Sequence, residues 1–82
     1  MRELSLIILF NNDATEKLND LEIDCELEMY DEREMIFYDI SAIAPRNSED
    51  REYTEIFSGG HSFICCEPYD TVRMKISECR KS

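Results

Sequence analysis

The chain has 82 residues, of which 43 % are hydrophobic and 34 % charged, with two glycines and two prolines. This length excludes a second domain, and this composition excludes collagen-like, low-complexity and wholly disordered chains. Nineteen acidic residues against nine basic ones leave a formal net charge of −10. Because phosphates and anionic lipids are bound by cations, this charge argues against direct contact with nucleic acid or a membrane. We therefore expect one small acidic domain over residues 1–82.

The first two elements are predicted to be a strand and a short helix. As a strand, residues 2–10 would be apolar on both faces toward their C-terminal end, which indicates an interior strand. The polar residues 11–13 end it, and Asp13 with Glu16 has the spacing of a capping box, so a helix is expected over residues 14–20. The side chains expected on its inward face are Ala14, Leu18 and Leu21.

Residues 21–30 show the most regular pattern in the chain, an alternation of apolar and polar side chains. Such alternation is typical of a half-buried antiparallel strand. Its carboxylates would share one face at roughly 6.5–7 Å, twice the rise per strand residue. That spacing is similar to the separation of successive phosphates along a nucleic-acid strand. The four carboxylates of this expected row are Glu22, Asp24, Glu26 and Glu28.

Two hairpins are predicted in the remainder of the sheet. A polar turn over residues 31–34 would join the acidic strand to a strand over residues 35–43, and residues 44–51 would form the longest loop. In the second hairpin, Gly59 and Gly60 would supply the positive φ angles of a primed turn. The pairs expected across that turn are Phe57 with Ser62, Ile56 with Phe63, and Glu55 with Ile64.

A C-terminal helix is predicted after Pro68, over residues 69–81, because proline is tolerated in a first helical turn. Its inward stripe would be Tyr69, Val72, Ile76 and Cys79, and its basic residues are Arg73, Lys75, Arg80 and Lys81. The expected fold class is α+β. It comprises a mostly antiparallel sheet of about five strands, the C-terminal helix packed on one face, and a short helix near the N-terminus.

The stretch Glu34–Ile76 resembles the FlbD-type flagellar and swarming-motility family. The resemblance rests on Tyr53–Gly60, on Ser62–Glu67 and on the helical residues Tyr69–Ile76. It covers about half of the chain and departs from the family in residues 1–31 and in the acidic loop before Tyr53. A β-hairpin followed by an amphipathic helix also closes regulatory DNA-binding domains of the LytTR type. The resemblance implies adaptor or regulatory work and carries over no catalytic residue.

The leading functional hypothesis is a non-enzymatic module that occupies a basic surface of a protein partner. Residues 20–34 hold eight acidic residues against Arg33, and a cationic surface would relieve their mutual repulsion. A nucleic-acid-binding enzyme would offer such a surface, and a phage-type, anti-CRISPR-like inhibitor would use it as a nucleic-acid mimic. The competing interpretation is a solvated strand face protected by charge. The residues expected to bind are Glu22, Asp24, Glu26, Glu28, Asp31, Glu32 and Glu34.

Two alternatives use other residues. A FlbD-like adaptor would bind through an apolar sheet face formed by Tyr53, Phe57 and Ile64, a face that could also meet a second subunit as a homodimer. A small oligomeric protein would instead hold an anionic or polar metabolite between subunits. The residues expected to contact that metabolite are Arg73, Lys75 and Arg80.

The sequence offers little support for catalysis, a metal or a cofactor. His61 with Cys65, Cys66 and Cys79 lacks a zinc-knuckle spacing, and adjacent cysteines point to opposite faces of a strand. The same placement disfavours a Cys–His nucleophile and a disulfide framework, so reduced thiols are expected, Cys25 included. The apolar run over residues 4–10 is too short to span a bilayer and lacks the flanks of a signal peptide, so we expect a cytoplasmic protein.

Overall fold

A computed structural model describes residues 3–48 and 50–80, so the expectations at Arg2 and Lys81 lie outside the described residues. Its fold is α+β, as expected from the sequence. The elements in chain order are β1 (Leu4–Phe10), α1 (Asp13–Asp20), the single 3₁₀ turn η1 (Leu27–Met29), β2 (Asp31–Phe37), β3 (Ala42–Asn47), β4 (Glu52–Ser58), β5 (His61–Cys65) and α2 (Tyr69–Arg80).

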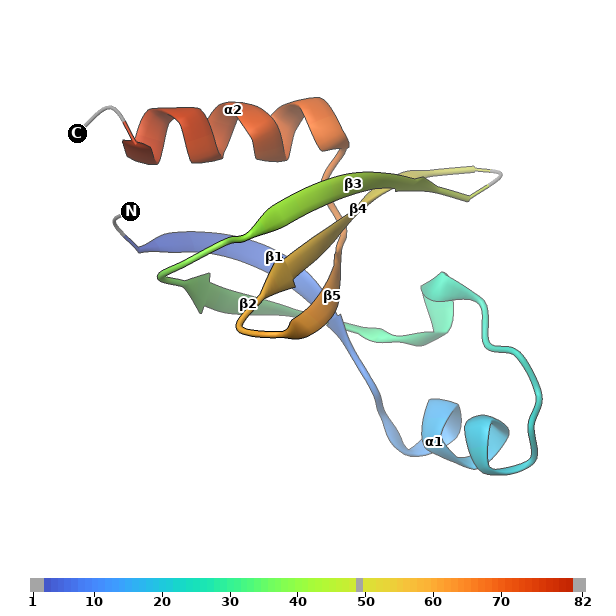
Figure 1. The fold of residues 1–82 in the computed structure, drawn as a ribbon. Helices are drawn as coiled ribbons and strands as arrows, with labels where there is room; N and C mark the ends of the chain where they lie inside the picture. The colour runs from blue at the N-terminus through green and yellow to red at the C-terminus, as the bar shows by residue number, and fades with distance from the viewer. Residues whose placement is uncertain (1–2, 49, 81–82) are drawn as a thin grey trace.

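The sheet consists of a two-stranded ribbon crossed by a three-stranded meander. Its strand order is β2-β1-β5-β4-β3, and every neighbouring pair is antiparallel. The ribbon β1–β2 meets β5 where Ile8 lies opposite Cys65 and the Cys66 N–H donates to the Ile7 carbonyl at 2.9 Å. Figure 1 shows the ribbon running across the meander, with α2 above the sheet and α1 at its far end. The expectation that the first strand is interior is confirmed.

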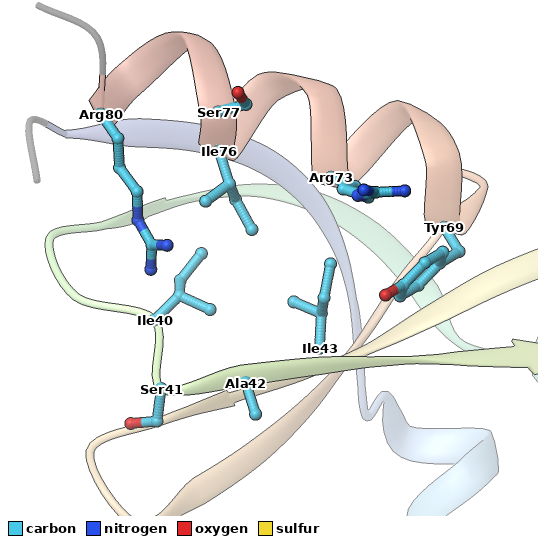
Figure 2. Close-up of a pocket in the computed structure, with 9 residues that line it drawn as sticks. All are labelled: Ile40, Ser41, Ala42, Ile43, Tyr69, Arg73, Ile76, Ser77 and Arg80. Atoms are coloured by element: carbon cyan, nitrogen blue, oxygen red, sulfur yellow. The ribbon is translucent and has the colours of Figure 1, made fainter.

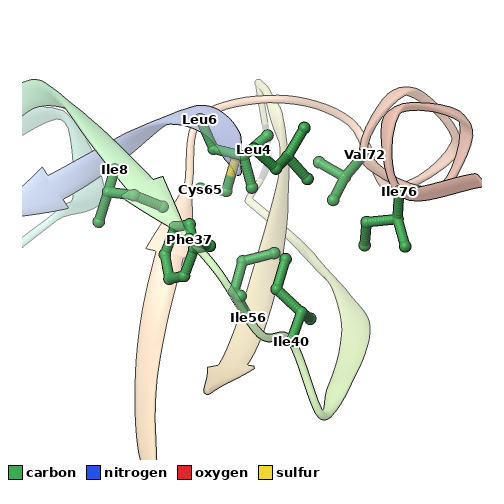
Figure 3. Close-up of a cluster of buried hydrophobic side chains, with 9 residues drawn as sticks. All are labelled: Leu4, Leu6, Ile8, Phe37, Ile40, Ile56, Cys65, Val72 and Ile76. Atoms are coloured by element: carbon green, nitrogen blue, oxygen red, sulfur yellow. The ribbon is translucent and has the colours of Figure 1, made fainter. Parts of the chain in front are cut away.

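The hydrophobic core lies between one face of this sheet and α2 (Figure 3). Alternation in β1 turns Leu4, Leu6 and Ile8 toward that face, and α2 covers it with Val72 and Ile76. Burying one such aliphatic side chain contributes roughly 1.5–3 kcal/mol. The remaining core residues are Phe37, Ile40, Ile56 and Cys65. The inward stripe predicted for the C-terminal helix is thus confirmed at its two central positions, and Tyr69 and Cys79 are half-buried.

The hairpin of β4 and β5 has the predicted register. Gly59 and Gly60 have φ angles of +59° and +80°, the two positive values that a primed turn requires. A Cβ atom on either glycine would meet no heavy atom within 4 Å, so glycine is favoured here by backbone conformation rather than by space. The pairs across the hairpin are Phe57 with Ser62, Ile56 with Phe63, and Glu55 with Ile64.

The strand predicted over residues 21–30 is wrong. The chain there leaves α1 through a Schellman-type turn, in which the Ile23 N–H donates to the Leu18 carbonyl at 2.9 Å and the Glu22 N–H to the Asn19 carbonyl at 3.0 Å. Glu22 adopts the left-handed conformation that this turn demands, with φ +59°. No strand can begin at Leu21, and the segment continues as a loop to η1.

The cap of α1 also differs from the expectation. Asn12, not Asp13, is the N-cap, and its side chain accepts from the Thr15 N–H at 2.9 Å while the Thr15 hydroxyl accepts from the Asn12 N–H at 2.8 Å. The Asn12 side-chain amide donates in addition to the Met29 carbonyl at 2.8 Å, which ties the start of α1 to the end of the loop. Thr15 is the buried residue of this helix, whereas Ala14 and Leu21 are exposed and Leu18 is half-buried.

Between residues 31 and 51, the strand boundaries differ from the predicted ones because strand pairing within the sheet sets them. The polar residues 31–34, expected as a turn, form the first half of β2 because they pair with β1 from Phe10 opposite Asp31 onward. The expected strand over residues 35–43 is divided, since β2 ends at Phe37 and β3 begins at Ala42. Residues 44–47 of the expected loop belong to β3, and beyond them the Ser48 N–H donates to the Arg51 carbonyl at 2.9 Å. The acidic strand therefore forms no hairpin, and β2 pairs with β1 instead.

Replacing Glu22 with glycine should stabilise the protein by roughly 0.5–1 kcal/mol. The left-handed conformation costs an L-residue about 1–2 kcal/mol, and glycine avoids this cost. Part of the gain is lost because glycine gives the unfolded chain more conformational entropy. Urea unfolding followed by circular dichroism measures the difference. Asp24→Gly, two residues further along the same exposed loop and without a positive φ, is the matched control and should be neutral or destabilising. A loss of stability in Glu22→Gly would contradict the Schellman assignment.

Candidate functional site

The predicted acidic residues are all exposed, but they do not form one row. Four lie in the loop between α1 and β2, and three lie on β2. On β2, alternation separates Asp31 from Glu32 and Glu34, because Glu32 and Glu34 lie opposite Leu9 and Ile7 on the sheet face that α2 does not cover. The even spacing of about 7 Å that a strand would impose is therefore absent. The loop carboxylates are Glu22, Asp24, Glu26 and Glu28.

Charge is nevertheless concentrated in one part of the molecule. Residues 13–34, which we call the acidic lobe, contain ten acidic and two basic residues and so carry −8 of the formal net charge of −10. The lobe comprises α1, the following loop with η1, and the first residues of β2, and Figure 1 shows α1 standing away from the sheet and from α2. The molecule is elongated, with principal extents of 45 × 25 × 19 Å. One end of an extended molecule is thus strongly anionic.

Few of the lobe's carboxylates are neutralised by a neighbouring cation. Asp31 lies 4.0 Å from the Arg33 guanidinium and Glu32 3.1 Å from that of Arg51. Within residues 3–48 and 50–80, no basic side chain lies within ion-pair distance of Glu34 or of the four loop carboxylates. Apolar side chains are interleaved with these acids and are also exposed, Leu21 at 69 % and Ile23 at 50 %. The lobe therefore offers both charge and apolar area to a partner.

The alternative apolar interface is only partly formed. Tyr53 is 1 % exposed, with the Arg51 guanidinium 5.3 Å from its ring centroid, so it is wrong as an interface residue. Burial raises the pKa of the Tyr53 hydroxyl. Phe57 is 37 % exposed and Ile64 is half-buried, and both lie on the sheet face opposite α2. Ile7 and Ile36 share that face and are 37 % and 43 % exposed, residues that the sequence patterns did not single out.

The three basic residues predicted to hold a metabolite do not share one site on α2. Lys75 forms an ion pair with Glu67, whereas Arg73 and Arg80 line a groove between α2 and β3 (Figure 2). The groove has a volume of about 480 Å³ and is floored by Ile40, Ile43 and Ile76. The sequence could not reveal it, because it requires α2 to pack beside the edge strand β3.

The cysteines and His61 form no reactive cluster. Among the described residues there is no group of three or more His, Cys, Asp or Glu side chains arranged to hold a metal ion. Cys25, Cys65 and Cys66 are free thiols. Burial is the main cause that raises the pKa of Cys65 to about 11 and that of Cys66 to about 12, with Glu32 as a further cause at Cys66. Both thiols are protonated near neutral pH and are therefore weak nucleophiles.

Neither described helix combines the length and the apolar character needed to cross a bilayer.

Comparisons with protein-family models, with curated proteins and with solved structures find no match. The resemblance to the FlbD-type family stays a prediction from the sequence.

The cysteines should differ in their rates of alkylation. In the folded protein at pH 8, iodoacetamide should modify Cys65 roughly 100-fold and Cys66 roughly 1000-fold more slowly than in urea, because pKa values of about 11 and about 12 leave correspondingly less thiolate than the ordinary thiol pKa of 9.0. Cys25, which is half-buried in the lobe, should be modified first. Peptide mass spectrometry over time measures each rate, and equal rates for Cys65 and Cys66 in the folded and unfolded chains would contradict the assigned burial.

Proposed function

We propose that this protein is a non-enzymatic binding module whose acidic lobe occupies a basic surface of a protein partner. The observation that carries the proposal is the net charge of −8 on residues 13–34. Five exposed carboxylates there have no cation within ion-pair distance in the described chain, and exposed apolar side chains lie between them. Repulsion among these carboxylates is relieved when a cationic surface covers them. Complementary fields of this kind also raise the association rate.

The partner class follows from this chemistry. Nucleic-acid-binding proteins present the extended basic grooves that an anionic lobe fits, and covering such a groove would inhibit the protein that carries it. The loop carboxylates are not held at strand spacing, so the proposal rests on the concentration of charge and not on a match to the spacing of phosphates. Leu21 and Ile23 add an apolar contact that resists salt, so binding should weaken with ionic strength without vanishing.

Charge reversal in the loop tests the proposal. The variant E22K/D24K/E26K/E28K should lose at least about tenfold in affinity, since several complementary charges become repulsive. The control E3K/D39K/E52K/E78K makes the same change in net charge at exposed residues outside the lobe and should retain binding. A pull-down at low and high salt identifies the partner, and titration calorimetry with that purified partner measures the affinity.

Equal loss in the two variants would show that net charge alone is responsible, and full capture by the loop variant would refute the proposal. Urea unfolding of both variants checks that the fold is kept.

We propose as a second candidate a regulatory adaptor of the FlbD-like kind, which binds through the uncovered sheet face. The exposed Ile7, Ile36 and Phe57 favour it, because a sheet face normally buries such side chains against a covering layer. Binding of this type resists salt. It should fail in F57D and persist in the loop charge-reversal variant, which is the reverse of the result expected for the acidic lobe.

A further inference from the structure

The groove between α2 and β3 is a concave surface with an apolar floor, separate from the acidic lobe. Ile40, Ile43 and Ile76 point into it, Tyr69 closes one end, and Arg80 reaches down from α2 at the other (Figure 2). A groove of about 480 Å³ with an apolar floor and polar groups at its margins is typical of sites that take a peptide segment or a small ligand.

The charge of this groove is opposite to that of the rest of the molecule. Its lining contains Arg73 and Arg80 and no carboxylate, in a protein with a net charge of −10. In the part of the chain that the structure describes, no carboxylate lies within 4.0 Å of either guanidinium. An occupant with carboxylates would therefore gain two cations that make no ion pair within that part of the chain.

One wall of the groove is the edge strand β3. Pro45 pairs with Thr54, and because proline has no N–H to give to β4, its nitrogen belongs on the open side of the edge. Strand alternation then turns the backbone groups of Ile43 outward as well, next to the groove. An open strand edge beside a helix is an arrangement that accepts an added strand from another chain.

The chain itself contains a segment with the matching chemistry. Residues 21–29 alternate apolar and acidic side chains as a strand does, yet they pair with no strand in this structure. Leu21 and Ile23 are largely exposed there, which leaves apolar area uncovered. Residues 25–28 of the segment lie beside Arg46 and Ser48, at the opposite end of β3 from Ile43 and the groove, and α1 lies further away (Figure 1). The occupant that we consider is therefore the same segment of a second copy.

We propose that the groove between α2 and β3 binds residues 21–29 of a second copy of this chain. On binding, η1 opens and the Asn12–Met29 hydrogen bond breaks, so that the segment lies extended along β3. Its apolar side chains fill the space between Ile43 and Ile76. Its carboxylates, which alternation turns to the solvent side, pair with Arg73 and Arg80 at the rim. This self-association does not rest on the proposed function. It hides the same segment that a basic partner would bind, so the two interactions compete.

Sedimentation equilibrium of the full chain over a range of concentrations tests the contact. The wild type should associate reversibly, and R73Q/R80Q should raise the dissociation constant about tenfold, as expected for the loss of two exposed ion pairs. The control K17Q/R33Q makes the same change in net charge within the lobe and should associate no more weakly than the wild type. A wild type that stays monomeric throughout, or a groove variant that associates like the wild type, overturns the proposal.

A mixing experiment shows which surfaces meet. L21S/I23S has an altered segment and an intact groove, whereas R73Q/R80Q has the reverse, so each alone should associate weakly and their mixture more strongly. No gain on mixing would refute the contact. F57D separates the groove from the uncovered sheet face, because loss of association in that variant alone would assign the interface to the sheet face and overturn the proposal.

A peptide of residues 20–30 with Cys25→Ser, labelled with a fluorophore, measures the groove directly by anisotropy. It should bind the wild type and bind R73Q/R80Q about tenfold more weakly. The groove variant keeps the lobe intact and should still capture a basic partner, so failure of self-association is distinguishable from failure of the proposed function.

Discussion

The contact between Ile8 and Cys65 determines the arrangement of the rest of the molecule. Both side chains are fully buried, and at this point the ribbon β1–β2 joins the meander β3–β4–β5. Because the two parts cross rather than run alongside each other, their buried faces enclose a core that one helix can cover. The Thr54 hydroxyl, donating to the Glu67 carbonyl at 2.8 Å, holds the chain leading into α2 against β4. Removal of this crossing would leave the ribbon and the meander without a shared core.

The acidic lobe is a consequence of how the ribbon is connected. A tight turn between β1 and β2 would need only a few residues, but the chain inserts α1, a loop and η1 between Phe10 and Asp31. Asn12 ties the two ends of this insertion together through the Met29 carbonyl and the Asp31 carboxylate. The insertion therefore projects beyond the sheet, and its exposed carboxylates stay hydrated because they are not buried against the hydrophobic core. Separation from the core allows the lobe to carry most of the negative charge at little cost to folding.

The two most distinctive surfaces of the described structure differ in charge. The two buried thiols are kept protonated by desolvation, and none of the described Cys, His, Asp or Glu side chains form a metal-binding group. An anionic lobe at one end and a cationic groove beside α2 instead give the molecule two surfaces of opposite character. In the two proposals made above, the lobe binds a basic partner and the groove binds a second copy, and the two interactions would compete for the same acidic segment.

Local chemistry determined part of this structure. Gly59 and Gly60 specify their turn because only residues that tolerate two positive φ angles fit it, and the register of the hairpin follows from that turn. The helical stripe at Val72 and Ile76 specifies α2 in the same way, since its period matches one buried helix face. For these elements the information lies within a few residues of sequence, and the α+β class follows from them.

Tertiary structure decided the elements whose local pattern has competing solutions. Residues 21–30 alternate as a strand should, but the helix before them ends in a turn that uses Glu22, and β1 takes Asp31–Phe37 as its partner. Pairing with β1 likewise turned the polar residues 31–34 from an expected turn into a strand. Tyr53 is buried where Arg51 and residues around η1 come together, and the groove exists because α2 lies beside β3. The sequence by itself determined the turn, the helix and the sign of the charge, whereas packing between distant segments decided which strands pair and where that charge lies.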